Sequence, residues 1–168
     1  MPDHIVYFAH GKESGPWGTK IQALAKIARD KGFHVESPDY STMMDPDERV
    51  KKLLALKPSA GKNLVLVGSS MGGYVSALAS AHLNVSGLFL LAPAFFIPGY
   101  AVQSPVPKAQ LTYIVHGWED NIVPVENSIR FSREHKSRLF LLPSDHRLVS
   151  VLTDVERFFC VFLENIFS

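Results

Sequence analysis

The sequence has one cysteine, no long apolar run and almost no excess of charge, and each of these absences excludes a class of protein. Cys160 has no second cysteine with which to form a disulfide inside the chain, as is usual in a reducing cytoplasm. No apolar stretch approaches the roughly 20 residues of a membrane span, and the first residues lack the basic and apolar regions of a signal peptide. With a net charge of +1 and no run of like charges, the surface offers little attraction for nucleic acid or an anionic membrane. We therefore expect a cytoplasmic protein with neither a nucleic-acid nor a membrane partner.

The composition is that of a globular domain. The 168 residues are 46% hydrophobic and 20% charged, enough for one core and too few for two full domains, so we expect a single domain over 1–168. Short apolar runs alternate with segments whose apolar residues recur every three or four positions. These patterns predict strands at 5–9, 33–36 (near a sheet edge), 64–67, 87–91, 111–116 and 138–142, and helices at 17–31, 45–57, 74–79, 124–135 and 155–166. Such alternation predicts an α/β fold, a three-layer α/β/α sandwich with a mostly parallel sheet.

A glycine and serine motif joins the third predicted strand to the helix after it. Gly68-Ser69-Ser70-Met71-Gly72 has the form G-x-S-x-G, in which small residues two positions before and after the serine permit a very tight turn. Such a turn exposes the serine hydroxyl at the carboxyl edge of a parallel sheet, at the positive N-terminus of a helix. Ser70 is therefore the candidate nucleophile for acyl transfer, with the N–H of Met71 directed at the oxyanion. The motif alone is a weak signal, because ordinary helix-capping turns share it.

Two later loops hold the groups that a serine nucleophile needs. Asp120 follows the strand predicted at 111–116, and His146 follows the last predicted strand. His146 can take the proton of Ser70, while Asp120 can fix the imidazole tautomer and stabilise its charged form. The chain order Ser, Asp, His is one of the known orders of a catalytic triad.

These motifs together resemble those of the α/β-hydrolase superfamily, over nearly the whole chain. The residues that carry the resemblance are Phe8-Ala9-His10-Gly11, Gly68 to Gly73 around the serine, His116-Gly117 with Asp120 and Val123-Pro124, and Ser144-Asp145-His146. The small size and the missing cap are most similar to compact bacterial esterase-like serine hydrolases, and the superfamily's leading antiparallel strands are expected to be absent. The resemblance implies a second oxyanion donor, the backbone N–H of Lys12.

Two other acids compete with Asp120 for its role. Asp145 is adjacent to His146 in sequence, where successive side chains diverge, and Glu119 is one residue out of the superfamily's register. This positional argument favours Asp120.

The proline-rich segment 93–107 follows the strand after the serine motif, where this superfamily often inserts a lid. Four prolines oppose a long helix there, so the segment is too small for a cap domain. We expect a flap over a shallow cleft that suits short acyl groups. The residues expected to bind substrate are Phe95, Phe96, Ile97, Tyr100 and, from the loop of the acid, Trp118.

The seven histidines include no set with the spacing of a metal site, so no metal is expected. His10 and His116 each precede a glycine at the end of a predicted strand, and we interpret both as hydrogen-bonding braces of their loops. Cys160 lies in an apolar helical pattern and is interpreted as a core residue.

Two functions from different classes fit the sequence. The first is a serine hydrolase that cleaves carboxylic esters or thioesters of small acyl groups through an acyl-Ser70 intermediate, with no cofactor. The second is a catalytically silent module that keeps the fold and binds a ligand or a protein, although an intact triad argues against it. The sequence leaves open whether Lys12 and Arg147, beside the site, select an anionic substrate or are solvated surface charges. It also leaves open the natural substrate, the leaving group and the oligomeric state.

Overall fold

Six strands form one sheet in the computed structural model, which describes all 168 residues. The strands are β1 (His4–Ala9), β2 (His34–Glu36), β3 (Asn63–Ser69), β4 (Val85–Leu91), β5 (Ala109–Gly117) and β6 (Arg138–Leu142). Their order is β2-β1-β3-β4-β5-β6, and every neighbouring pair is parallel. The predicted α/β class is confirmed, and β2 lies at a sheet edge, as expected.

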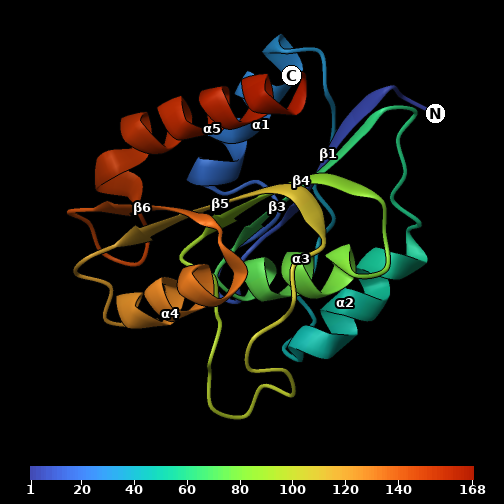
Figure 1. Ribbon diagram of the computed structural model, residues 1–168. Helices are drawn as coiled ribbons and strands as arrows, with labels where there is room; N and C mark the ends of the chain where they lie inside the picture. The colour runs from blue at the N-terminus through green and yellow to red at the C-terminus, as the bar shows by residue number, and fades with distance from the viewer.

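Five helices cover the two faces of this sheet (Figure 1). They are α1 (Thr19–Asp30), α2 (Pro46–Ala55), α3 (Met71–Ser80), α4 (Val125–His135) and α5 (Leu152–Ile166), the last preceded by a short 3₁₀ turn at Val149–Val151. In Figure 1, α1 and α5 lie on one face, whereas α2, α3 and α4 lie on the other. The predicted three-layer sandwich is therefore confirmed. None of the helices combines the length and the apolar character that crossing a membrane requires.

Each face of the sheet carries its own hydrophobic core, and β1 shows how the sequence divides between them. Val6 and Phe8 point into the core beneath α1 and α5, whereas Ile5 and Ala9 point into the core on the opposite face. All seven residues of β4 are buried, because both of its faces are covered. Covered faces explain why the central strands are continuous apolar runs in the sequence.

Local signals fix several helix boundaries. Asp45 is the N-cap of α2 and accepts a hydrogen bond from the backbone N–H of Asp47 at 2.9 Å, with Pro46 as the first helical residue. Gly32 follows α1 with φ of +86°, a left-handed conformation that ends helices and favours glycine. Segment 93–107 contains neither helix nor strand, in agreement with its prolines.

The parallel sheet brings the carboxyl ends of its strands to one edge. The loop after β1 begins at His10, the turn after β3 holds Ser70, the loop after β5 holds Asp120 and the loop after β6 holds His146. Segments that are up to 136 residues apart in sequence therefore converge at this edge.

Candidate active site

Ser70 lies in a strained turn between β3 and α3. Its backbone has φ of 54° and ψ of −117°, an unusual conformation for a residue other than glycine. The flanking glycines are a steric requirement, because a Cβ on Gly68 would lie 2.2 Å from the carbonyl oxygen of Gly72. A Cβ on Gly72 would lie 1.8 Å from the carbonyl oxygen of Ala9. The tight turn thus presents Ser70 at the N-terminus of α3 and packs directly against the end of β1.

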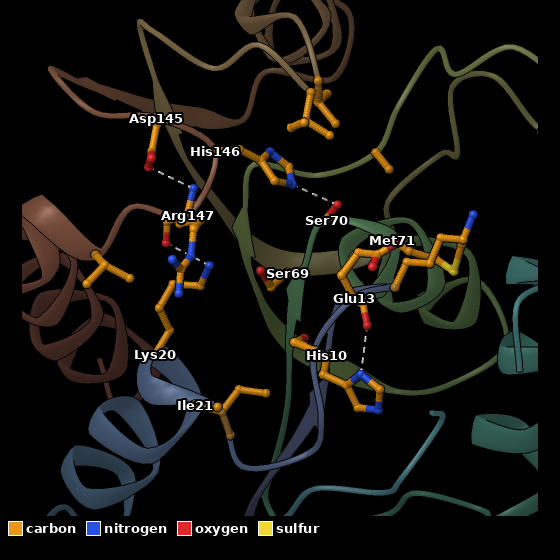
Figure 2. A pocket seen from close by; sticks show the side chains of 18 of the residues that line it. His10, Glu13, Lys20, Ile21, Ser69, Ser70, Met71, Asp145, His146 and Arg147 are labelled. Atoms are coloured by element: carbon orange, nitrogen blue, oxygen red, sulfur yellow. Dashed lines mark hydrogen bonds between the residues drawn. The ribbon is translucent and has the colours of Figure 1, made fainter. Parts of the chain in front are cut away.

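The structure brings the three residues of the expected triad together. The His146 Nε2 atom is 3.0 Å from Ser70 Oγ, and Figure 2 shows the imidazole directed at the serine. The His146 Nδ1 atom is 2.6 Å from Asp120 Oδ2. A carboxylate only accepts hydrogen bonds, so Nδ1–H donates to Asp120, and Nε2 is left to accept from the Ser70 hydroxyl. This is the arrangement that activates a serine.

Asp120 is held by more than His146. Its side chain is fully buried; Oδ1 accepts from the backbone N–H groups of Ile122 and Val123, each at 2.8 Å, and Oδ2 also accepts from His116 Nε2–H at 2.9 Å. Burial alone would raise the pKa of Asp120, but these hydrogen bonds and that from His146 together hold the pKa well below its ordinary value of 3.8. Asp120 is therefore ionised at neutral pH.

The competing acids lie elsewhere. Asp145 Oδ1 accepts from the backbone N–H of Arg147 at 3.0 Å, and Figure 2 shows the carboxyl group on the far side of the loop from Ser70. Glu119 is exposed. Of the three acids, only Asp120 forms a hydrogen bond with the His146 ring.

The two expected oxyanion donors flank Ser70. Met71 is the first residue of α3, directly after the serine. On the other side, a Cβ built on Gly11 would lie 3.6 Å from the Cβ of Ser70, so the peptide that joins Gly11 to Lys12 runs beside the serine. The N–H of Lys12 makes no hydrogen bond to another backbone group. Both Met71 and Lys12 line the cleft at Ser70.

A cleft of about 950 Å³ opens at Ser70, and eight of its 23 lining residues are hydrophobic. Two of the predicted substrate-binding residues, Ile97 and Tyr100, line it. Three basic residues line it as well: Lys12, Lys20 and Arg147. The cleft is therefore more polar than the apolar roof expected from the sequence.

Phe95, Phe96 and Trp118 do not line the cleft, contrary to expectation. Phe95 is fully buried in the core, where its ring stacks on Phe131 with centroids 4.0 Å apart. Phe96 packs instead under the Arg130 guanidinium, 4.0 Å from its ring centroid, and Trp118 is 53% exposed. An aromatic ring gains more from stacking in a dry core than from lining a wet cleft, which accounts for Phe95.

Lys20 and Arg49 are residues that sequence reasoning missed. Lys20, in the first turn of α1, donates from Nζ to the carbonyl of Arg147 at 2.8 Å (Figure 2), and burial beside the charge of Arg147 lowers its pKa to about 8. Arg49 is fully buried on α2 and donates to the carbonyls of His10 and Gly11. Its position one turn before buried Leu53, on the inner face of α2, was the signal available in the sequence.

No group of three or more His, Cys, Asp or Glu side chains is placed to hold a metal ion. His10 and His116 are both fully buried and hydrogen-bonded within the loops that they were expected to brace.

Comparisons with known proteins agree with this architecture. Residues 4–104, more than half of the chain, match the sequence model of an uncharacterised protein family, UPF0227. A proposed hydrolase of the alpha/beta superfamily from Xanthomonas campestris pv. campestris is 29% identical, with a TM-score of 0.87 over 96% of this chain and 99% of that one.

Two more distant structures share the fold. Est1E from Butyrivibrio proteoclasticus has a TM-score of 0.86 at 19% identity, over 99% of this chain and 89% of that one. The esterase Pf2001 from Pyrococcus furiosus has a TM-score of 0.75 at 19% identity, over 98% and 83% of the two chains. A search of curated proteins gave no match. Hydrolases and esterases thus share this architecture over nearly its whole length, which supports a hydrolase activity. The chain has the α/β-hydrolase fold and belongs to the UPF0227 family.

Proposed function

We propose that the protein is a serine hydrolase that cleaves carboxylic esters or thioesters of small acyl groups through an acyl-Ser70 intermediate. The observation that carries the proposal is the unbroken series of hydrogen bonds from Ser70 through His146 to Asp120. The strained turn at Ser70 and two backbone N–H groups beside it provide the other parts that acyl transfer requires.

In the acylation step, His146 Nε2 takes the proton of Ser70 as Oγ attacks the carbonyl carbon of the substrate. The negative charge that forms on the carbonyl oxygen is stabilised by the N–H groups of Met71 and Lys12. Asp120 stabilises the imidazolium and keeps the ring oriented, and it stays ionised throughout. The imidazolium then donates its proton to the departing alcohol or thiol.

Deacylation repeats these steps with water as the nucleophile. His146 removes a proton from the water, which attacks the acyl carbon, and the same two N–H groups stabilise the second oxyanion. The proton passes to Ser70 Oγ as the carboxylic acid leaves, which restores the resting site.

The lining of the cleft supports a small or partly polar substrate. The hydrophobic lining residues can bury part of an acyl group, at about 0.8 kcal/mol for each fully buried methylene, while the basic residues of the same cleft can contact polar groups of the substrate. Est1E has been solved with ferulic acid bound, so a hydroxycinnamoyl ester belongs in the substrate panel with short acyl esters and thioesters. Because Lys12, Lys20 and Arg147 line the cleft, an ester that carries a carboxylate belongs there too.

The decisive variant is Ser70→Ala. It removes the attacking atom, so turnover of an activated ester should fall by about 10⁶-fold, the size of the effect when the nucleophile of a serine protease is removed. Labelling of the wild-type protein by a fluorophosphonate, which reacts with activated serines, should be lost in the same variant.

Ser69→Ala, the matched control, removes a neighbouring hydroxyl and should keep most of the activity and all of the labelling. A Ser70→Ala variant with wild-type turnover would disprove the mechanism. A wild-type protein that is neither labelled nor active on any ester would favour the silent binding module.

A further inference from the structure

Arg49 is a buried cation without a buried anion beside it. Its side chain is fully buried on α2, and no carboxylate lies within ion-pair distance. Nε donates to the carbonyl of Met43 at 2.9 Å, and Nη1 donates to the carbonyls of His10 at 2.8 Å and Gly11 at 3.2 Å, while Nη2 has no partner. Burying an unpaired charge costs several kcal/mol, so stability alone is a poor reason for this arrangement. Its partners suggest another reason, because two of them belong to the loop beside Ser70.

His10 holds the carbonyl of Gly11 from a second direction. The backbone N–H of Tyr40 donates to His10 Nε2 at 2.9 Å, so this nitrogen carries no proton, and Nδ1 is the protonated atom in the neutral ring. Nδ1–H therefore donates to the carbonyl of Gly11, at 2.7 Å. Burial lowers the pKa of His10, which keeps the ring neutral and this tautomer fixed.

The geometry of a peptide unit connects this carbonyl to the site. The chain contains no cis peptide, so the Gly11 carbonyl and the Lys12 N–H, which share one peptide unit, point in opposite directions. Two donors hold the carbonyl, Arg49 Nη1 and His10 Nδ1–H; the Arg49 side chain does not line the cleft, whereas His10 is among its lining residues. The Lys12 N–H therefore points away from these donors, and Gly11 lies beside Ser70, since a Cβ on Gly11 would be 3.6 Å from the Cβ of Ser70.

Residue 11 is also the place where the peptide is easiest to turn over. Glycine has no Cβ to restrict rotation, so its own backbone does little to prevent a flip of the peptide that follows it. A flipped peptide would direct the carbonyl of Gly11 at the oxyanion, which it would repel, and would direct the N–H into the interior. External hydrogen bonds to the carbonyl are therefore what keeps the donor in place.

We propose that Arg49 and His10 are positioning residues for the oxyanion hole, which hold the carbonyl of Gly11 inward and so aim the N–H of Lys12 at the substrate oxygen. The proposal rests on the serine hydrolase activity proposed above. In this role both side chains act through the Gly11 peptide and not directly on the reacting atoms. The charge of Arg49 at the carbonyl end of the peptide also polarises it, which makes the N–H a stronger donor.

The test is Arg49→Met, which keeps an unbranched side chain of similar length and removes the charge and every donor. Loss of one oxyanion donor costs about 10²- to 10³-fold in kcat, so we expect kcat to fall by about 10²-fold, with KM changed by less than about twofold. The affinity for a boronic acid that forms a tetrahedral adduct on Ser70 should fall by a similar factor. The matched control is Arg29→Met, which removes an exposed guanidinium over the ring of Trp17 and should leave kcat unchanged.

A second pair of variants approaches the same carbonyl from His10. His10→Leu removes the Nδ1–H donor and should also lower kcat, whereas His10→Asn supplies an amide N–H in its place and should restore part of the loss. The pH dependence should keep its wild-type shape in all of these variants, because the proton-transfer groups are untouched. This pair decides the matter if Arg49→Met does not fold.

The outcomes separate the two proposals. If Arg49→Met or His10→Leu lowers the melting temperature but leaves kcat unchanged below it, the residues are only structural and this inference is wrong. Equal losses in His10→Leu and His10→Asn would also overturn it. If wild-type protein is not labelled by a fluorophosphonate and hydrolyses no ester, the proposed function has failed instead.

Discussion

His10 and His116 occupy equivalent places in the fold but bind different partners. His10 directly follows β1 and His116 is the next-to-last residue of β5, and each precedes a glycine and is fully buried. His116 donates to the carboxylate of Asp120, whereas His10 donates to the backbone carbonyl of Gly11. One histidine therefore braces the proposed proton-transfer half of the site through a side chain, and the other braces the proposed oxyanion half through the backbone. The same sequence feature, a histidine followed by a glycine, thus supports the site in two different ways.

The largest effect within this comparison should come from Asp120→Asn. The variant removes the charge that stabilises the imidazolium and favours the wrong tautomer of His146, so kcat should fall by about 10⁴-fold, as in the serine protease example. Steady-state kinetics on an activated ester would measure it. Asp145 lies in the same loop as His146, but its side chain accepts a hydrogen bond only from the Arg147 N–H. Asp145→Asn should therefore cost little activity. The opposite ranking would transfer the acid role to Asp145.

His116→Leu should reduce both stability and activity. It removes one of the four hydrogen bonds to Asp120 and leaves the Ser128 hydroxyl without its partner at 2.7 Å. Unsatisfied buried groups cost about 1–3 kcal/mol each, and we expect kcat/KM to fall about tenfold because one charge-assisted bond is lost. Urea unfolding and kinetics would measure the two effects.

The exposed His82 provides the control, because His82→Leu should alter neither quantity. If His10→Leu lost as much stability as His116→Leu and no more kcat than His116→Leu, the proposed difference between the roles of the two histidines would be contradicted.

The smallest effect concerns Lys20, which donates a hydrogen bond to the carbonyl of Arg147 in the His146 loop. Its pKa is lowered from 10.5 to about 8, so between these values the unfolded chain holds a proton that the folded chain has released. Folding stability from this group therefore rises with pH from about 8 to 10, by at most about 1.4 kcal/mol per pH unit. The free energy of unfolding, measured for wild type and Lys20→Met across this range, should show a difference that grows in favour of the wild type. A pH-independent difference would contradict it.

Much of the fold could be predicted because its signals are local. Strands β3 and β4 contain continuous apolar runs, at 64–67 and 87–91, and the turn at Ser70 needs glycines at fixed positions. The order of Asp120 and His146 along the chain then indicated which loops would meet at the sheet edge. The structure places His146 within hydrogen-bond distance of Ser70, and Asp120 within hydrogen-bond distance of His146, as their order suggested.

The misplaced residues depend on partners that are distant in sequence. Phe95 lies in the core and not in the cleft because its ring stacks on Phe131, which is 36 positions later in the sequence. Arg49 is an arginine on a helix, and such residues are usually solvated, so its helical spacing from Leu53 was a weak signal beside the carbonyls that it meets in another loop.

The contact of Gly72 with the carbonyl of Ala9 has a consequence for how such a site can diversify. Since the two backbones touch, the turn that carries the nucleophile and the end of β1 have no room for even one methyl group between them. The segment 93–107 joins β4 to β5 outside this contact, with no helix or strand of its own. The N–H of Ala94, at the start of this segment, donates to the carbonyl of Ser70 at 3.0 Å, so only insertions and deletions further along the segment can reshape the substrate cleft while the backbone of the nucleophile stays in place.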